Sequence, residues 1–158
     1  MPDIEIGMGK TARPAYGLDD ISIVPSRRTR DLEDVDTGWE IDAHAFAVPI
    51  MASGMDSVVS PTTAVALGEM GSVGPLNLEG LWTRHDDPEE ILVRIARLPE
   101  DEAWAEMRRA YAAPVRPELI RDRVKEIRAS GVVSCGSVTP HRVEALADAS
   151  SPPSSTCW

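Results

Sequence analysis

Cysteines are few in this sequence, and long apolar runs and clustered positive charges are missing. Two cysteines, Cys135 and Cys157, in 158 residues do not make a disulfide framework. No segment approaches the roughly 20 apolar residues of a membrane-spanning helix. Residues 1–10 include Asp3 and Glu5 and lack the apolar stretch of a signal peptide. These absences predict a soluble, cytoplasmic protein with no membrane partner.

Positive charge is sparse: 16 Lys and Arg residues stand against 26 Asp and Glu residues, and the formal net charge is −10. Proteins that bind nucleic acid gather Lys and Arg against the phosphates. The one basic run, Arg27 to Arg30, is followed at once by Asp31 and Glu33, which indicates a mixed-charge loop. We therefore expect no nucleic-acid partner.

Carboxylates and histidines form no metal-binding pattern. Asp19 and Asp20 are adjacent, but no histidine or further carboxylate lies at ligand spacing, so we interpret them as acids that structure a loop. His44, His85 and His141 have no motif around them and are predicted at the surface. The sequence thus predicts no metal site.

Short apolar segments alternate with helical ones. Ser60 suits a helix N-cap, Pro61 the first helical position and Gly71 the stop. An alternation of Ile21 and Ile23 with polar residues predicts a short strand. A polar loop is expected over residues 27–42, further strands over 48–51, 72–76 and 132–134, and helices over 60–71, 86–98, 101–111, 117–130 and 139–149.

This order of elements predicts the fold class. Strands that alternate with helices form parallel βαβ units, so the chain is expected to be an α/β protein. Short strands that end in small polar residues suit a barrel, in which the reactive groups lie at the carboxyl ends of the strands. A complete (β/α)₈ barrel needs roughly 250 residues. We therefore expect an incomplete TIM barrel of about three βα units.

Three motifs carry the functional information. Residues 16–25 read Tyr-Gly-Leu-Asp-Asp-Ile-Ser-Ile-Val-Pro, residues 49–58 read Pro-Ile-Met-Ala-Ser-Gly-Met-Asp-Ser-Val, and residues 71–80 read Gly-Ser-Val-Gly-Pro-Leu-Asn-Leu-Glu-Gly. In this order and spacing they resemble the opening of the IMP dehydrogenase/GMP reductase family. Residues 77–84 resemble its actinobacterial IMP-dehydrogenase-related subgroup. The resemblance extends from about residue 6 to residue 148.

The resemblance implies a reaction. Family members oxidise IMP to XMP with NAD in guanine nucleotide biosynthesis, or reduce GMP with NADPH, and normally form homotetramers. A thiolate attacks C2 of the purine, and hydride passes to or from a nicotinamide. These properties are expected of an intact parent protein. We expect this chain to bind NAD or NADP poorly and to be inactive by itself.

The resemblance also implies site residues. Ser53 and Met55 match positions that contact bound IMP, where a hydroxyl and a polarizable thioether suit a purine nucleotide. Asn77 and Glu79 follow the second predicted strand and are candidates for the barrel mouth. Cys135 follows a predicted strand and is interpreted as a small barrel-lining residue. The family's nucleophile lies in a Gly-rich loop that this sequence does not match, so no catalytic residue is assigned.

Two departures from the family pattern are visible. Classical IMP dehydrogenases carry paired CBS domains after the second barrel unit, whereas here a short helical connection, residues 81–116, precedes the third strand. GMP reductases and the actinobacterial relatives share this absence. Pro75 also stands where the family has an aliphatic or aromatic residue, and a proline removes a ladder donor from a strand.

The last residues break the pattern. Residues 1–149 are interpreted as the partial barrel, but residues 150–158 form a Ser/Pro-rich tail where a fourth strand is expected. In the adjacent reading frame, the codons of the tail allow Val-Asp-Leu-Leu-Val, a strand-like sequence. We therefore interpret the tail as a frameshift product, which sequencing of the gene tests. Two other interpretations stay open: a non-catalytic fragment that associates with full-length subunits, and a different phosphate-binding barrel.

Overall fold

The computed structural model describes residues 3–24 and 31–150. The chain divides into two compact units, Met1–Asp36 (unit 1) and Thr37–Trp158 (unit 2), which are described separately. The basic run Arg27 to Arg30, Pro25 and all of the predicted aberrant tail except Ser150 lie outside the described residues.

Unit 1 contains an antiparallel hairpin and two short 3₁₀ turns. Strands β1 (Ile4–Gly7) and β2 (Lys10–Ala12) pair through a turn at Gly9, whose φ of 71° suits a glycine. The 3₁₀ turns are η1 (Leu18–Asp20) and η2 (Leu32–Asp34).

The strand predicted around Ile21 and Ile23 is wrong. These side chains are 57% and 99% exposed, and no described residue pairs with them. The Gly17 amide instead donates to the Asp20 carboxylate at 3.0 Å, which closes η1. This contact confirms the loop-structuring role of Asp20.

Unit 2 begins with a second hairpin, whose first strand lies inside the segment 27–42 that was predicted as loop. Strand β3 (Trp39–Ile41) pairs antiparallel with β4 (His44–Phe46), and the Trp39 and Phe46 rings stack with centroids 5.0 Å apart. The Trp39 indole also donates to the Val48 carbonyl at 2.7 Å. Aromatic pairing across the hairpin therefore supplies the stabilisation that the polar residues of this segment do not.

A short parallel sheet forms the centre of unit 2. Strand β5 (Pro75–Asn77) pairs in parallel with β6 (Cys135–Ser137), and Met51 forms an isolated parallel bridge with Val73, directly before β5. The segment around β5 therefore lies between the other two, in the order of the chain. This arrangement confirms the α/β class with parallel pairing. Pro75 is the first residue of β5, a position that tolerates its missing N–H.

Strand β6 begins three residues later than the strand predicted over residues 132–134. Gly131, with a φ of 79°, ends the preceding helix, and Val132 then packs against helix α1 (Pro61–Glu69). A Cβ built on Gly68 of α1 would lie 2.5 Å from the Val132 Cβ. This packing uses Val132 as a helix contact, so the pairing starts at Cys135.

The helices agree closely with the predictions. Ser60 caps α1 by accepting from the Thr63 amide at 3.1 Å. The predicted helices over 86–98 and 101–111 form as two helices separated by Leu98 and Pro99. The remaining elements are η3 (Leu81–Thr83), α2 (Pro88–Arg97), α3 (Glu100–Ala112), α4 (Pro117–Ala129), η4 (Pro140–Arg142) and α5 (Val143–Ser150).

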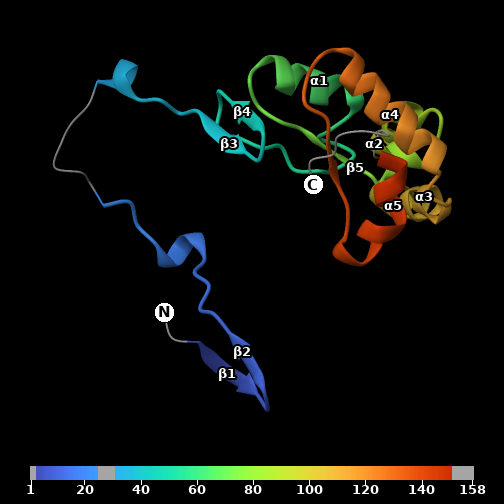
Figure 1. Cartoon of the computed structure of the whole chain (residues 1–158). Helices are drawn as coiled ribbons and strands as arrows, with labels where there is room; N and C mark the ends of the chain where they lie inside the picture. Colours follow the sequence, from blue (N-terminus) through green and yellow to red (C-terminus); the bar gives the residue numbers. More distant parts are fainter. Residues whose placement is uncertain (1–2, 25–30, 151–158) are drawn as a thin grey trace. The chain divides into compact units, whose positions relative to one another are not determined.

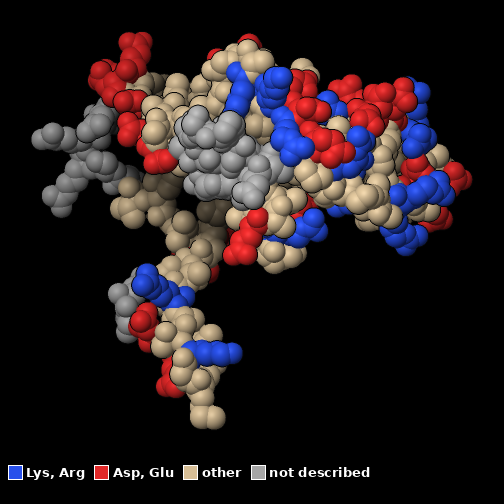
Figure 2. All heavy atoms as spheres, turned by 45° about the vertical axis from the view of Figure 1, so that its right-hand side comes forward, with Lys and Arg blue, Asp and Glu red and all other residues tan. Residues whose placement is uncertain are grey.

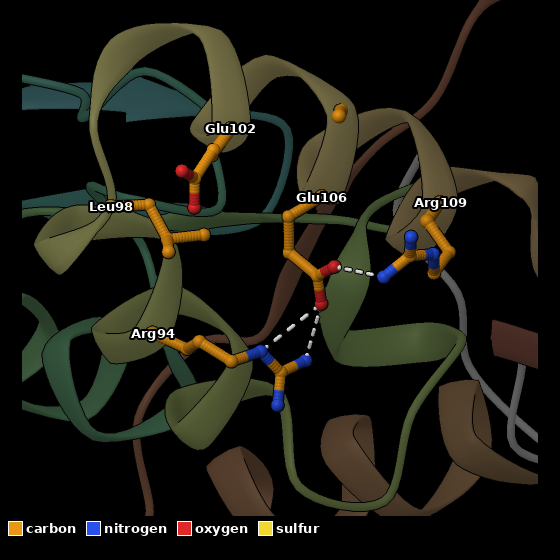
Figure 3. Close-up of a pocket in the computed structure, with 6 residues that line it drawn as sticks. Arg94, Leu98, Glu102, Glu106 and Arg109 are labelled. Carbon is orange, nitrogen blue, oxygen red and sulfur yellow. Dashed lines mark hydrogen bonds and ion pairs between the residues drawn. The ribbon is translucent and has the colours of Figure 1, made fainter.

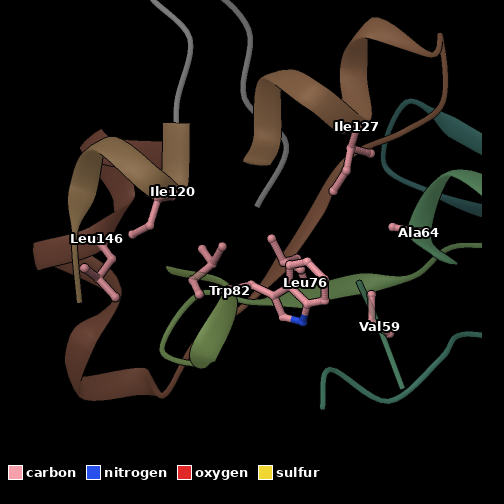
Figure 4. Close-up of a cluster of buried hydrophobic side chains, with 8 residues drawn as sticks. Val59, Ala64, Leu76, Trp82, Ile120, Ile127 and Leu146 are labelled. Carbon is pink, nitrogen blue, oxygen red and sulfur yellow. The ribbon is translucent and has the colours of Figure 1, made fainter. Parts of the chain in front are cut away.

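The core lies between the sheet and the helices. Helix α4 contacts η3. It also contacts α1 and α5 (Figure 1). Leu76 of β5 is fully buried beside Trp82, and side chains from the surrounding elements close around them (Figure 4). Each such fully buried aliphatic side chain contributes roughly 1.5–3 kcal/mol. The core cluster consists of Val59, Ala64, Leu76, Leu78, Trp82, Ile120, Ile127 and Leu146.

Opposite charges alternate on the helical surface of unit 2. Figure 2 shows Lys and Arg interspersed with Asp and Glu on this side. Arg94 pairs with Glu106 at 2.6 Å, and Arg116 pairs with Asp86 at 2.7 Å. None of the helices within residues 3–24 and 31–150 is long and apolar enough to cross a bilayer.

Replacing Ser60 by alanine tests the helix cap. Ser60→Ala leaves the Thr63 amide without its acceptor, so we expect the free energy of unfolding to fall by about 1 kcal/mol. Urea titrations followed by far-UV circular dichroism measure it. Thr62→Ala, at an exposed neighbouring position, is the control. Equal losses in the two variants would contradict the role of the cap.

Candidate functional site

The carboxyl ends of the parallel segments form one edge of the sheet. The Ala52 amide donates to the Val73 carbonyl at 3.1 Å, and the Leu78 amide donates to the Ser137 carbonyl at 2.9 Å. Because all three segments run in the same direction, the residues that follow them emerge together. These are residues 53–59, 78–84 and 138–142, and we call this the strand-end edge.

The loop after the first segment is held against the end of β6. A Cβ built on Gly54 would lie 2.6 Å from the Ser137 Cβ and 3.2 Å from the Pro75 carbonyl oxygen, so only glycine allows this approach. Ser53 and Met55, on either side of Gly54, are exposed, and Met55 is 51% accessible. Both predicted nucleotide-contacting side chains are therefore accessible at the strand-end edge.

The second loop is joined to the third. The Asn77 amide oxygen accepts from the Glu79 amide at 3.1 Å, which fixes the turn after β5. The Glu79 carboxylate accepts from both the amide and the hydroxyl of Thr139, each at 2.7 Å, and lies 3.8 Å from the Arg142 guanidinium. Asn77 is thus the last residue of β5, although the sequence predicted it beyond the strand, and Glu79 lies two residues later, where it is engaged in a contact between loops.

These contacts change the acidity of Glu79. Partial burial acts to raise the pKa of this carboxyl, but the two hydrogen bonds from Thr139 and the charge of Arg142 outweigh it. The pKa of Glu79 consequently lies below its ordinary value of 4.5, so the contact holds an ionised carboxylate.

Asp56 is a site residue to which the sequence assigned no role. Its side chain is only 6% exposed, and its Oδ1 has no hydrogen-bond partner among the described residues. The Tyr111 hydroxyl, from α3, donates to Oδ2, and the Trp82 indole donates to the Asp56 carbonyl at 3.3 Å. The Met-Asp-Ser-Val motif points to Asp56, but no local pattern marks Tyr111 as its partner.

Tyr111, which bonds to Asp56, also lies beside the cationic Arg84. The Arg84 guanidinium lies 5.9 Å from the Tyr111 ring centroid and donates to the carbonyls of Glu79, at 3.0 Å, and Ala113. Burial and the adjacent Asp56 carboxylate both raise the pKa of Tyr111. The phenol thus stays protonated and keeps donating to Asp56.

The described cysteine is unsuited to nucleophilic attack. The sequence predicted that Cys135 follows a strand, but it is the first residue of β6. Its side chain is half-buried, and this burial raises the pKa of the thiol. A raised pKa lowers the thiolate fraction, so Cys135 is a poor nucleophile.

The histidines were predicted at the surface, and the three differ in exposure. The His85 ring is half-buried with Nε2 2.8 Å from the Ala110 carbonyl, and His44 is half-buried in β4. His141 is exposed, as predicted. Among residues 3–24 and 31–150, no group of three or more His, Cys, Asp or Glu side chains is arranged to hold a metal ion.

A pocket between α2 and α3 contains ion pairs among its own lining side chains. It measures about 630 Å³ and is lined by charged side chains around Leu98 (Figure 3). Glu106 accepts from Arg94 and from Arg109, at 2.6 and 2.7 Å. Both lining arginines are therefore already paired with Glu106, so neither is a free cation for a ligand.

Known proteins share the sequence and fold of most of this chain. An uncharacterized oxidoreductase of Mycolicibacterium smegmatis is 43% identical over 148 residues, which make up 90% of this chain and 40% of that protein. One from Mycobacterium tuberculosis is 44% identical over the same length. The crystal structure of an IMP dehydrogenase/GMP reductase-like protein from Corynebacterium glutamicum matches with a TM-score of 0.76 and 39% identity, over 94% of this chain and 41% of that one. The chain is related to the IMP dehydrogenase/GMP reductase-like proteins.

This relationship confirms the resemblance predicted from the three motifs. An inosine-5′-monophosphate dehydrogenase of Methanocaldococcus jannaschii is 29% identical over 66 residues, or 42% of this chain. No family model matches the chain. The chain spans about 40% of the length of the mycobacterial relatives. Its homologues are thus oxidoreductases of the IMP dehydrogenase/GMP reductase-like type.

Adding a methyl group at Gly54 tests the packing of the first loop. Gly54→Ala places a Cβ against Ser137 and Pro75, so we expect a loss of about 1–3 kcal/mol in the free energy of unfolding. Urea titration measures this loss. Gly7→Ala is the control, because nothing lies within 4 Å of its added Cβ. A Gly54→Ala chain as stable as the control would show that the close approach is absent.

The Glu79 contact predicts a pH dependence. A carboxyl whose pKa is lowered in the folded chain stabilises that chain above its unfolded pKa, and this stabilisation is lost as the pH falls through the folded pKa. Glu79→Gln is therefore expected to destabilise the chain at neutral pH. Its deficit should shrink below about pH 4, as measured by urea titrations across this range. Glu144→Gln, at an exposed position of α5, is the control, and a deficit independent of pH would contradict the assignment.

Proposed function

We propose that this chain is the N-terminal part, about three βα units, of a TIM-barrel oxidoreductase that acts on IMP. The parent reaction is the NAD-dependent oxidation of IMP to XMP in guanine nucleotide biosynthesis. The chain supplies a part of the purine-nucleotide site and is inactive by itself. The NADPH-dependent reduction of GMP is the second candidate, since the matched Corynebacterium protein is described as similar to both enzymes.

One observation carries the proposal. Ser53 and Met55 are both accessible at the strand-end edge, in a loop that Gly54 holds against β6. In α/β barrels the carboxyl ends of the strands hold the reactive groups. The Ser53 hydroxyl offers a hydrogen bond to a nucleotide, and the Met55 thioether offers a polarizable surface to a purine ring.

The contact between Glu79 and Thr139 does not fit a nicotinamide dinucleotide. A dinucleotide pyrophosphate needs free donors, but the amide and hydroxyl of Thr139 already donate to Glu79. The Glu79 carboxylate would also repel the pyrophosphate. We therefore assign NAD or NADP to the parent protein, derive no step through it, and expect this chain to bind it poorly.

The reacting thiol is likewise assigned to the parent. Nucleophilic attack on the purine requires a thiolate, and burial of Cys135 favours its protonated form. The parent is proposed to be a cytoplasmic homotetramer, as its relatives in the family are expected to be.

Nucleotide binding by this chain is the direct test. With methyl-¹³C methionine in the chain, IMP is expected to shift the Met55 resonance, assigned by Met55→Leu, and to leave that of Met70 unchanged. Ribose 5-phosphate, which lacks the purine, should shift Met55 less. Ser53→Ala is expected to weaken IMP binding roughly two- to tenfold, the effect of one hydrogen bond.

The control for the serine is Ser57→Ala, an exposed position in the same loop. A Met55 signal that does not respond to IMP would contradict the proposed function. So would NADH production from IMP and NAD by the purified chain, because it would show that the chain needs no further thiol.

A further inference from the structure

Asp56 lies directly after Met55, in the same loop, and has an unusual environment. Its carboxylate is almost fully buried, and Oδ1 has no hydrogen-bond partner among the described residues. A Cβ built on Gly80 would lie 1.9 Å from Oδ1, so this oxygen points at the Gly80 backbone. Of the side chains described, that of Tyr111 alone donates to this carboxylate.

A buried carboxylate depends strongly on its few donors. Without the Tyr111 hydroxyl, the Asp56 side chain would be buried with no donor to either oxygen among the described side chains. Such a group moves toward water, because a buried polar group without a hydrogen-bond partner is unfavourable. Moving Asp56 would also move Met55, whose carbonyl accepts from the amides of Val58 and Val59 at 2.9 and 2.8 Å.

Tyr111 is itself fixed by contacts at both ends of the helical connection. Arg84 lies over its ring and donates to the Glu79 and Ala113 carbonyls, which precede and follow the α2–α3 pair. The Arg116 amide donates to the Thr83 carbonyl at 2.8 Å and closes the same base. These contacts close the base of the α2–α3 connection and so hold the Tyr111 hydroxyl beside Asp56.

We propose that Tyr111 is a positioning residue that holds the loop bearing Ser53 and Met55 in its nucleotide-accepting conformation through the Asp56 carboxylate. This inference rests on the proposed function for the identity of the ligand. The positioning itself is a property of the chain without nucleotide, so the two can be tested separately.

The first experiment measures the loop without nucleotide. In chains labelled with methyl-¹³C methionine, Tyr111→Phe is expected to shift the Met55 resonance and to leave that of Met70 in place. Tyr16→Phe, at the chain's other tyrosine, is the matched control and should change neither. Asp56→Asn keeps an oxygen that can accept from Tyr111, so we expect it to preserve the Met55 position. A Met55 resonance that is unchanged in Tyr111→Phe overturns the proposal.

The second experiment leaves Tyr111 unmodified. In the Tyr16→Phe chain, tyrosinate absorbance reports on Tyr111 alone. Because burial and Asp56 raise its pKa, the phenol should ionise above the ordinary value of 10.0, and Asp56→Asn should lower the midpoint. A midpoint at or below 10.0, or one that Asp56→Asn does not lower, overturns the proposed contact even if Tyr111→Phe fails to fold.

Addition of IMP separates the two proposals. Where both hold, Tyr111→Phe weakens IMP binding by roughly tenfold or more, the loss expected for one hydrogen bond to a charged group. If IMP leaves the wild-type Met55 signal unchanged while Tyr111→Phe shifts it, the positioning role stands and the nucleotide function fails. If IMP binds Tyr111→Phe and the wild type equally well, the positioning role fails and the nucleotide function stands.

Discussion

The parallel pairing around β5 is the constraint on which the rest of unit 2 depends. One side of this segment bonds to Met51 and the other to β6, so two neighbours that are far apart in sequence are aligned by a single strand. Leu76 and Leu78 alternate with Asn77 along it and bury their side chains in the core. The same pairing that forms the core therefore brings the three loops together at the strand-end edge.

Those loops are joined by side chains and not by the sheet alone. Glu79 bonds to Thr139 after the third strand, and Asp56 after the first strand bonds to Tyr111 in the helical connection. The short strands form few backbone hydrogen bonds with one another, so these side-chain contacts help to fix the positions of the loops at the strand-end edge. Each depends on a buried or half-buried carboxylate, which makes the edge sensitive to the loss of a single donor.

Much of this fold could be predicted from the sequence, because its helices carry local signals. Ser60 and Gly71 mark the ends of α1 without reference to anything distant. The strands were less predictable: the Val132–Ser134 run resembles a strand, yet Val132 is used against Gly68, a contact visible only in three dimensions. For the same reason the sequence pointed to Ser53 and Met55, within a motif, but not to Tyr111, which acts on Asp56 from 55 residues away.

The closed base of the helical connection has a mechanical consequence. Hydrogen bonds from Arg84 to Ala113 and from Arg116 to Thr83 hold the two ends of the α2–α3 connection side by side. A connection whose ends are already joined can change in length at a small entropic cost, because loop closure depends only weakly on loop size. Exchanging it for another module would leave the strands in register, but the new module would have to supply its own donor for the buried Asp56.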